Sequence, residues 1–255
     1  MAERRRALVT GAASRIGRAM VLDLAGSGWD VAIHYRGSDT EAEATAEDAR
    51  ALEATACTVQ ADLLIEREVE TIVAKARDSL GGPLSLLINN ASLFEGDQIA
   101  TMTRDSWDRA IESNLRAPVK LTQDFAAQAP TAVMDARGEP VAQAVVINLI
   151  DQRVLKPTPM FFSYFIAKSG LHAFTRTAAQ ALAPHVRVAG IGPGPTLAAT
   201  EQTDAHFAKQ RAACLLGRGS DPEDIISAMR FILSNKAFTG QMLAIDGGQH
   251  LNWQT

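Results

Sequence analysis

The sequence predicts an α/β fold: a doubly wound parallel sheet of about seven strands flanked by helices. Short apolar runs rich in β-branched residues alternate with longer amphipathic stretches along the 255 residues, a pattern typical of repeated strand–helix units. The first unit joins its strand to its helix through a glycine-containing turn. Sequence motifs continue from Thr10 to Asp246 within this alternation. We therefore expect a single domain over residues 1–255.

The elements follow one another at the spacing that such a sheet requires. The seven expected strands are Ala7–Val9, Asp30–His34, Cys57–Gln60, Leu84–Ile88, Ala144–Leu149, Arg187–Ile191 and Gln241–Ile245. The six expected helices are Arg18–Ser27, Glu41–Glu53, Glu66–Leu80, Arg104–Gln128, Ser163–Leu182 and Pro222–Ser234. The last helix begins at a proline, which suits the first helical position. Thr131–Val141 is polar with Gly and Pro and predicts a surface loop, whereas Pro195–Gly219 shows only a weak helical pattern.

Composition narrows the class of protein. Hydrophobic residues make up 47% of the chain and charged residues 21%, values typical of a soluble globule with a sizeable core. The net charge of −4 gives no support for nucleic-acid binding. The two cysteines and five histidines show no ligand spacing, so no metal site is expected. No apolar run reaches the length of a membrane span and no secretory pattern is present, so a cytoplasmic location is expected.

The turn Thr10–Gly17 connects the first strand to the first helix. A glycine turn lets the backbone approach a pyrophosphate, and the N-terminus of the following helix offers unpaired N–H groups to an anion. An ordinary tight strand–helix turn has the same appearance, so this motif does not identify a nucleotide site by itself. In such a sheet, ligands bind beyond the carboxyl ends of the strands.

A second motif lies on the helix predicted over Ser163–Leu182. Tyr164 and Lys168 are four residues apart, so both side chains project from one face of a helix. A free tyrosine has a pKa of roughly 10, and a nearby ammonium group favours the phenolate, which would bring the pKa closer to the working range of a catalytic acid. Surface helices also carry such pairs by chance. Asp151 lies thirteen residues before the tyrosine.

Together these motifs resemble the short-chain dehydrogenase/reductase family over nearly the whole chain, which implies a Rossmann-type fold and a nicotinamide cofactor. The matching positions, in the order of the family pattern, are Thr10-Gly11 with Gly17, Asn89-Asn90-Ala91-Ser92, Asn114, Tyr164, Lys168, Pro193-Gly194 and Asp246-Gly247-Gly248.

Three positions depart from the family pattern. Arg15 stands where the middle glycine of the first turn belongs, Ser92 replaces the last glycine of Asn-Asn-Ala-Gly, and Asp151 occupies the place of the catalytic serine. With His34-Tyr35-Arg36 and Phe94, these departures resemble the pteridine reductase branch of the family. That resemblance implies reduction of pterins or folates with NADPH.

The residues after the second strand bear on the choice of cofactor. An NAD-dependent enzyme usually has a carboxylate there for the ribose hydroxyls, but this chain reads His34-Tyr35-Arg36-Gly37-Ser38. A guanidinium group is always charged and can bind two phosphate oxygens, so Arg36 suits a 2′-phosphate, and Arg15 could approach the same phosphate. Either arginine alone could equally be a solvated side chain. Two cations without an acid favour NADPH.

The family resemblance also implies a role for each cofactor-binding position. Asp62, followed by Leu63, would bind adenine, although a helix N-cap is an alternative for Asp62. Asn89 and Ala91 would line the cofactor ribose, and Thr196 would contact the nicotinamide carboxamide or the diphosphate. The full expected set is Gly11, Ser14, Arg15, Ile16, Gly17, Tyr35, Arg36, Asp62, Leu63, Asn89, Ala91, Pro193, Gly194 and Thr196.

The expected catalytic residues are Asp151, Tyr164, Lys168 and Asn114. By resemblance, Lys168 would bind the nicotinamide ribose, Tyr164 would deliver a proton, and the backbone carbonyl of Asn114 would hold a water in a proton relay. Asn114 could instead only satisfy a local backbone kink. An ionised Asp151 would repel an oxyanion, which disfavours ketone reduction, whereas reduction of a pterin C=N bond needs protonation at nitrogen. Alternatively, Asp151 caps a loop or pairs with Arg153 outside the site.

Phe94 and Ser92 are the expected substrate contacts, because a ring at position 94 could stack on a flat pterin. Core packing is the alternative for Phe94. Phe161, Phe162 and Phe165 are expected to be core or interface residues.

Three functions therefore compete. The leading hypothesis is an NADPH-dependent reductase of a pterin or dihydrofolate-like substrate. The alternatives are an NADPH-dependent carbonyl reductase of a 3-oxoacyl thioester, sugar or small ketone, and a catalytically silent NADPH-binding regulator. By family resemblance we expect a homotetramer, paired through Arg104–Gln128 and Ser163–Leu182, with residues 195–219 covering the substrate.

Overall fold

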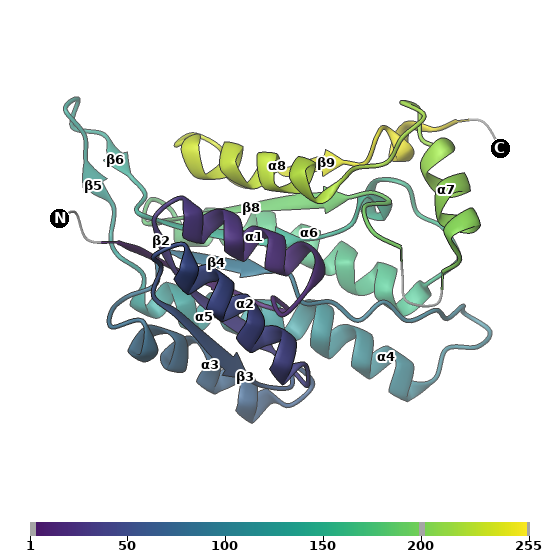
Figure 1. Cartoon of the computed structure of the whole chain (residues 1–255). Helices are drawn as coiled ribbons and strands as arrows, with labels where there is room; N and C mark the ends of the chain where they lie inside the picture. Colours follow the sequence, from purple (N-terminus) through teal and green to yellow (C-terminus); the bar gives the residue numbers. More distant parts are fainter. Residues whose placement is uncertain (1–3, 199–201, 254–255) are drawn as a thin grey trace.

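The centre of the molecule is a seven-stranded parallel sheet in the order β3-β2-β1-β4-β7-β8-β9 (Figure 1). A computed structural model describes residues 4–198 and 202–253. The strands of the sheet are β1 Arg5–Val9, β2 Trp29–Tyr35, β3 Ala56–Gln60, β4 Leu86–Asn89, β7 Ala144–Leu149, β8 Val186–Pro193 and β9 Met242–Ile245. All seven predicted strands are present, and the predicted fold class is confirmed.

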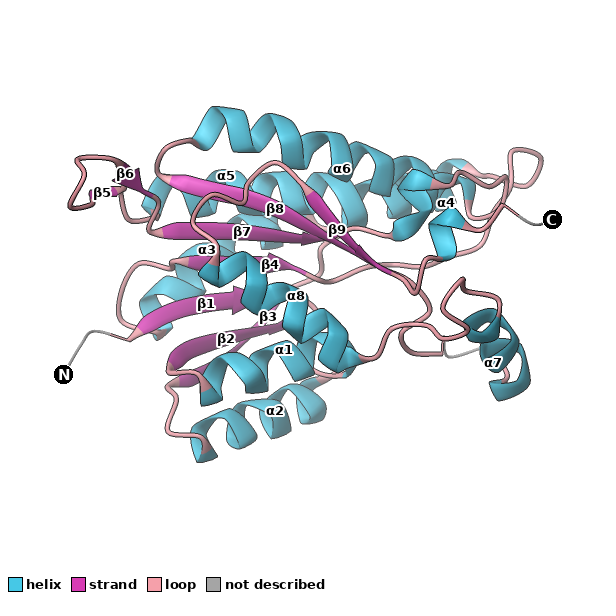
Figure 2. Cartoon of the chain, turned by 90° about the horizontal axis from the view of Figure 1, so that it is seen from above, coloured by secondary structure: helices cyan, strands magenta, loops and turns pink. Residues whose placement is uncertain are grey.

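Helices cover both faces of the sheet (Figure 2). Helices α1, α2 and α8 pack on one face, and α3, α5 and α6 pack on the other. The helices are α1 Arg15–Gly26, α2 Asp39–Ala51, α3 Glu66–Ser79, α4 Arg104–Ile111, α5 Ala117–Gln128, α6 Phe162–Leu182, α7 Asp204–Ala212 and α8 Pro222–Ser234. The two layers follow from strand periodicity: Ala7 and Val9 of β1 join the core under α1 and α8, whereas Leu8 between them joins the core on the other face.

The topology places a crevice at the carboxyl end of β1. Strand β1 pairs with β2 on one side and with β4 on the other, so the chain reverses its direction of travel across the sheet here. Loops that leave neighbouring strands in opposite directions open a ligand-binding crevice at such a point. The site described below lies at this edge.

The predicted long helix Arg104–Gln128 is interrupted in its middle. A π-helical segment, η1 Glu112–Arg116, separates α4 from α5. Pro118 has no N–H to donate to the carbonyl of Asn114 four residues earlier, and the Asn114 side-chain amide donates to the Ala110 carbonyl at 3.1 Å. Both features favour a local departure from α-helical bonding at Asn114.

Two predicted irregular segments contain short elements. Val133–Met134 (β5) pairs antiparallel with Pro140–Val141 (β6) in the stretch expected to be a loop, and this hairpin projects from the sheet at the end opposite the site (Figure 1). Helix α7 lies within the weakly patterned 195–219 region, at the carboxyl end of the sheet. In the described part of the chain, no helix has the length and apolar character needed to cross a bilayer.

Candidate active site

The turn between β1 and α1 brings its backbone against the segment that follows β4. Gly11 has a φ of +60°, and a Cβ atom there would lie 2.8 Å from Ala91 Cα. A Cβ atom at Gly17 would lie 2.4 Å from the carbonyl oxygen of Gly11. Ser14, the N-cap of α1, makes no side-chain capping bond to the first turn of the helix. The result is a backbone cradle beside a helix N-terminus, which fits a dinucleotide pyrophosphate.

Asn90 rather than Asn89 faces this turn. The Asn90 Nδ2 atom donates to the carbonyl oxygens of Thr10 at 2.8 Å and Gly11 at 3.0 Å. The Asn89 side chain points the other way, is 2% exposed and donates to Asn148 Oδ1 at 2.8 Å. Successive residues at the end of a strand point in opposite directions. The Asn89 side chain therefore points away from the crevice, whereas Asn90 lines the cavity described next. The contact predicted between Asn89 and the cofactor ribose stays a prediction.

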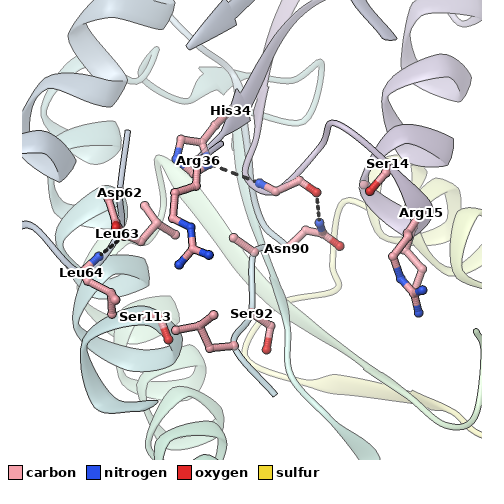
Figure 3. Close-up of a pocket in the computed structure, with 15 residues that line it drawn as sticks. Ser14, Arg15, His34, Arg36, Asp62, Leu63, Leu64, Asn90, Ser92 and Ser113 are labelled. Atoms are coloured by element: carbon pink, nitrogen blue, oxygen red, sulfur yellow. Dashed lines mark hydrogen bonds between the residues drawn. The ribbon is translucent and has the colours of Figure 1, made fainter. Parts of the chain in front are cut away.

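A cavity of about 400 Å³ extends from the turn along the crevice (Figure 3). Nine residues of the expected cofactor set line this cavity: Gly11, Ser14, Arg15, Ile16, Gly17, Arg36, Asp62, Leu63 and Ala91. The other lining residues are Ser92, which was expected to contact the substrate, and His34, Leu64, Asn90, Leu93 and Ser113. Figure 3 shows the Arg36 guanidinium directed into this cavity. The cavity thus unites residues from the ends of four strands, β1, β2, β3 and β4, with Ser113 of η1.

A second hollow of about 310 Å³ adjoins the first at Gly11, Ser14 and Arg36. Tyr35 and Ser38 also line it. Ser38 is the N-cap of α2 and makes no side-chain capping bond. A cation, two hydroxyl groups and a helix N-terminus around one hollow suit a phosphate group, in keeping with the 2′-phosphate expected near Arg36.

Asp62 and Leu63 follow β3 and form one wall of the larger cavity. The Asp62 Oδ1 atom accepts the N–H of Leu64 at 3.0 Å. The N-cap of helix α3 is Ile65. Asp62 therefore stabilises a turn and is not the helix cap that was the alternative for it.

Arg15 and Arg36 are not brought together. Arg15 has a φ of +56°, and its Nη2 atom donates to the carbonyl oxygens of Leu197 at 3.3 Å and Ala198 at 2.8 Å. Figure 3 places it on the opposite side of the cavity from Arg36. Arg15 thus connects the glycine turn to the segment expected to cover the substrate. Residues 199–201 of that segment lie outside the described residues.

The remaining predicted cofactor contacts lie at the carboxyl ends of β8 and β9. Pro193 ends β8, and the Gly194 N–H donates to the Ile245 carbonyl oxygen at 2.9 Å. The Thr196 hydroxyl is 5% exposed and lies 2.6 Å from the hydroxyl of Ser220. None of the three lines either cavity. They lie at the carboxyl edge of the sheet, and their predicted roles stay predictions.

His34 supports the glycine turn from β2 and was not predicted to do so. Its Nδ1 atom accepts the N–H of Gly11 at 3.2 Å, and its Nε2 atom lies 3.2 Å from the carbonyl oxygen of Ala61. This pair of contacts fits the neutral ring with the proton on Nε2. Burial lowers the pKa of His34 from 6.5 to about 4, against the smaller opposing effects of the Ala61 bond and of Asp62. The imidazole is therefore a neutral bridge between two loops of the cavity.

This burial predicts a pH-dependent stability. Below pH 6.5 an unfolded chain takes up a proton on His34, whereas the folded chain does so only near pH 4. Acidification through this window is therefore expected to lower the free energy of unfolding by about 2–3 kcal/mol. Urea unfolding of the wild type and of His34→Asn at pH 7 and pH 4.5 would measure the difference. Exposed His206, replaced in the same way, should leave the wild-type pH dependence intact; an equal dependence in His34→Asn would contradict the assignment.

Asp151, Tyr164 and Lys168 meet beyond the end of β7. The Tyr164 hydroxyl donates to Asp151 Oδ2 at 2.9 Å, and the Asp151 Oδ1 atom accepts the N–H of Arg153 at 2.8 Å. Lys168 Nζ donates to the carbonyl oxygen of Leu149 at 2.8 Å. Tyr164 is 5% exposed and Lys168 2% exposed. Asp151 therefore caps the short helix η2 Gln152–Leu155, as one alternative proposed, and its other oxygen faces the phenol.

Burial dominates the electrostatics of this trio. It raises the pKa of Asp151 above the usual range for a carboxyl group, against the bond from the Arg153 N–H and the charges of Arg153 and Lys168. Burial and the facing Asp151 charge raise the pKa of Tyr164 well above 10. Burial also lowers the pKa of Lys168 to about 8, although Asp151 partly opposes this.

The expected effect of Lys168 on the phenol is absent from this arrangement. The Lys168 Nζ atom lies 5.7 Å from the centre of the Tyr164 ring and bonds to a backbone carbonyl instead. The pKa of Tyr164 therefore rises, where the sequence predicted that the ammonium would lower it. A buried carboxylate at hydrogen-bond distance outweighs an ammonium that does not contact the hydroxyl.

Asn114 joins η1 to the segment after β4. It is fully buried, its Nδ2 atom donates to the Leu93 carbonyl oxygen at 3.0 Å, and its Oδ1 atom accepts the Ser92 hydroxyl at 2.6 Å. These bonds satisfy the side chain locally. Because Pro118 cannot bond to the Asn114 carbonyl oxygen, the predicted role of that oxygen in holding a water is compatible with the same geometry.

Two phenylalanines border the trio of Asp151, Tyr164 and Lys168. The Phe94 ring is 44% exposed, stacks on Phe161 at 4.2 Å with an interplanar angle of 14°, and meets the Tyr164 ring edge-on at 4.9 Å. Core packing, the alternative for Phe94, does not describe this position. Phe161, expected in the core or an interface, instead forms part of the site. Its φ of +58° places it at the start of α6 in the left-handed region.

Asp97 holds the Phe94 loop onto the start of the helix that carries Tyr164. Its Oδ1 atom accepts the N–H of Ser163 at 2.9 Å, and its Oδ2 atom accepts the hydroxyls of Ser163 at 2.5 Å and Ser106 at 3.1 Å. The sequence did not predict a role for this buried acid. Asp97 bonds to a helix start 66 residues later in the chain, and no local pattern indicates such a contact. Among the described residues, no cluster of His, Cys, Asp or Glu could hold a metal ion.

The chain is similar to known dehydrogenases and reductases in both sequence and structure. A sequence model of the family described as short chain dehydrogenase matches residues 5–210. FolM alternative dihydrofolate reductase 1 from Brucella suis, solved in complex with NADP, has a TM-score of 0.91 and 43% identity, and the match covers 100% of this chain and 98% of that one. The corresponding protein from Brucella canis, also complexed with NADP, has a TM-score of 0.89 and 42% identity, and the match covers 98% of this chain and 96% of that one. The 3-oxoacyl-[acyl-carrier-protein] reductase FabG of Staphylococcus aureus is 29% identical over 252 residues, 96% of this chain and 98% of that protein.

Proposed function

Because the chain belongs to the short-chain dehydrogenase/reductase family, we propose that it is an NADPH-dependent reductase of a pterin or dihydrofolate-like substrate. The observation that carries this proposal is the 2.9 Å hydrogen bond from the Tyr164 hydroxyl to Asp151 in a nearly buried site. The family pattern has a serine in place of that aspartate. The FolM proteins, which are described as alternative dihydrofolate reductases, support the same substrate class.

NADPH fits the crevice through the residues already described. The glycine cradle would hold the pyrophosphate, and the hollow lined by Arg36, Ser14 and Ser38 would hold the 2′-phosphate. Asp62 would meet the adenine, and Lys168 would bind the nicotinamide ribose. When bound, NADPH supplies a hydride. Both FolM structures contain NADP.

The proton chemistry follows from Asp151 and Tyr164. Reduction of a C=N bond adds a hydride to carbon and a proton to nitrogen. Burial raises the pKa of Asp151, so this carboxyl group can carry a proton closer to neutral pH than an exposed aspartate can. The Tyr164 hydroxyl, bonded to Asp151 Oδ2, would pass that proton to the substrate nitrogen or orient the carboxyl that does so. Phe94 would stack on the flat ring through its exposed part.

A second candidate is a carbonyl reductase, which the similarity to FabG favours. Ketone reduction places negative charge on oxygen in the transition state. In its ionised form the Asp151 carboxylate, which stands where the family pattern has a hydroxyl, would repel that charge. This electrostatic conflict places the carbonyl reductase second.

The proposal includes the assembly. We propose that the chain acts as one domain and forms a homotetramer through the α4–α5 and α6 surfaces, with residues 195–219 over the substrate. The hydrogen bonds from Arg15 to Leu197 and Ala198 support a contact between the start of region 195–219 and the glycine turn after β1.

A substrate panel tests the proposed activity. We expect NADPH oxidation with dihydrobiopterin and dihydrofolate and little oxidation with acetoacetyl thioester, measured by absorbance at equal enzyme concentration. NADH should support a lower rate, because the Arg36 hollow then lacks its phosphate. Brisk ketone turnover without pterin turnover would establish the carbonyl reductase, and cofactor binding without turnover of any substrate would establish the silent regulator.

A further inference from the structure

Arg153 lies beside the catalytic carboxyl but is not part of the family pattern. It belongs to the short helix η2, and its Nε atom lies 4.0 Å from Asp151 Oδ2. That oxygen is the one that accepts the Tyr164 hydroxyl. The side chains of Arg153 and Asp151 are 21% and 17% exposed, so water screens their interaction only in part.

Aromatic rings hold the guanidinium in this place. Its carbon atom lies 4.8 Å from the centre of the Phe161 ring and 5.6 Å from the centre of the Phe94 ring. Such contacts attract a cation without using its N–H donors. Across residues 4–198 and 202–253, no hydrogen bond from the guanidinium of Arg153 is found, in contrast to Arg187 and Arg211, which bond to backbone carbonyls. The fold therefore places this cation without consuming its donors.

The other charged groups near Asp151 are engaged elsewhere. Lys168 on α6 donates to the Leu149 carbonyl oxygen. The 3-10 helix η3 Gln249–Leu251, which packs against η2, carries His250, and this ring bonds to Asp246 at 2.7 Å. Lys156, which follows η2, bonds to the carbonyl oxygen of Asn252. Among the described residues, Arg153 is thus the cation that pairs with the oxygen facing Tyr164, while the charge of Lys168 also favours ionised Asp151.

We propose that Arg153 is a positioning residue, which holds the Asp151 carboxylate against the Tyr164 hydroxyl and allows it to ionise in a nearly buried site. Burial alone favours the neutral acid, and an acid that does not lose its proton cannot deliver it to the substrate. The cation opposes this effect. The catalytic consequence rests on the proposed function, whereas the effect on the charge of Asp151 does not.

The two tyrosines of the chain allow a direct test without substrate. Protein labelled with ¹³C at tyrosine Cζ should give two resonances, and Tyr164→Phe identifies the one that belongs to Tyr164. Its chemical shift should follow the charge of the hydrogen-bonded Asp151 as pH changes. In Arg153→Met, which keeps apolar contact with the two rings, we expect the midpoint of this titration to move upward by about one pH unit.

Matched variants separate charge from structure. Arg153→Gln is a second uncharged variant and should show the same upward shift, whereas Arg153→Lys should stay near the wild-type midpoint. Arg104→Gln removes an exposed arginine that pairs with Asp108 on α4 and should leave the midpoint unchanged. A wild-type midpoint in Arg153→Met or Arg153→Gln would overturn the proposal, as would an equal shift in Arg153→Lys.

Enzyme activity provides an independent second measurement. If pterins are the substrates, the pH limb of kcat/KM should move upward with the resonance midpoint in Arg153→Met. Absence of pterin turnover by the wild type would remove the proposed function. The shift of the Tyr164 resonance would still decide the role of Arg153, so the two failures are distinguishable.

Discussion

Replacing Tyr164 by phenylalanine is expected to lower kcat for dihydrobiopterin by about 10²–10⁴-fold, the range typical for loss of a positioned proton donor. The ring would remain, with its edge-on contact to Phe94 at 4.9 Å, so the variant removes the hydroxyl and little else. Asp151 would lose the hydrogen bond at 2.9 Å and with it the route that connects the carboxyl to the substrate. Steady-state kinetics of NADPH oxidation measure the loss.

Cofactor binding provides the control for this variant. Tyr164 lines neither the 400 Å³ cavity nor the 310 Å³ hollow, so the Kd for NADPH in a fluorescence titration should stay close to that of the wild type. The loss should therefore fall on kcat. A Tyr164→Phe enzyme that keeps most of its kcat would show that the proton reaches the substrate by another route, and the proposed role of the phenol would be rejected.

The fold could be predicted from local sequence because parallel strands buried on both faces leave a clear pattern. Runs such as Ala144–Leu149 are apolar throughout and bounded by turn residues, and every residue of this strand is buried in the structure. Element ends were less accurate: α1 begins at Arg15, not Arg18. The interruption at Glu112–Arg116 was missed because the amphipathic pattern of the sequence continues through the π-helical segment.

The candidate site was predictable where it depends on spacing and not where it depends on side-chain direction. The four-residue spacing of Tyr164 and Lys168 and the position of Asp151 sufficed to bring these residues together. The choice between Asn89 and Asn90 depends on a single step along a strand, and the sequence offers no signal for it. The direction of Arg15 depends on Leu197 and Ala198, which lie more than 180 residues away along the chain. The contacts of Asp97 with Ser163 and those of Arg153 with the Phe94 and Phe161 rings also join distant parts of the chain or depend on side-chain direction.

Substitution of Asp151 separates the two candidate reductase activities. Asp151→Asn keeps the shape of the side chain and an acceptor for the Tyr164 hydroxyl but can carry neither a charge nor an acidic proton. Asp151→Ser restores the residue type of the family pattern. Both replacements suit an N-cap, so each can accept the Arg153 N–H and preserve the start of η2.

We expect both variants to lose pterin reduction by about 10²-fold or more, because the proton donor for the ring nitrogen is weakened while the cofactor cavities are untouched. The pKa of Asp151 is raised by burial, so the protonated form is present below that pKa and is lost as pH rises through it. In the wild type, kcat/KM for dihydrobiopterin should fall across that range, and Asp151→Asn should lack this limb.

The serine variant carries the sharper test, because removing the carboxylate also removes the repulsion of a developing oxyanion. Asp151→Ser should therefore turn over acetoacetyl thioester faster than the wild type while it loses pterin activity. Full pterin activity in Asp151→Ser would mean that the carboxyl group has no part in proton delivery. The 2.9 Å contact with Tyr164 would then be structural only, and the carbonyl reductase would become the better assignment.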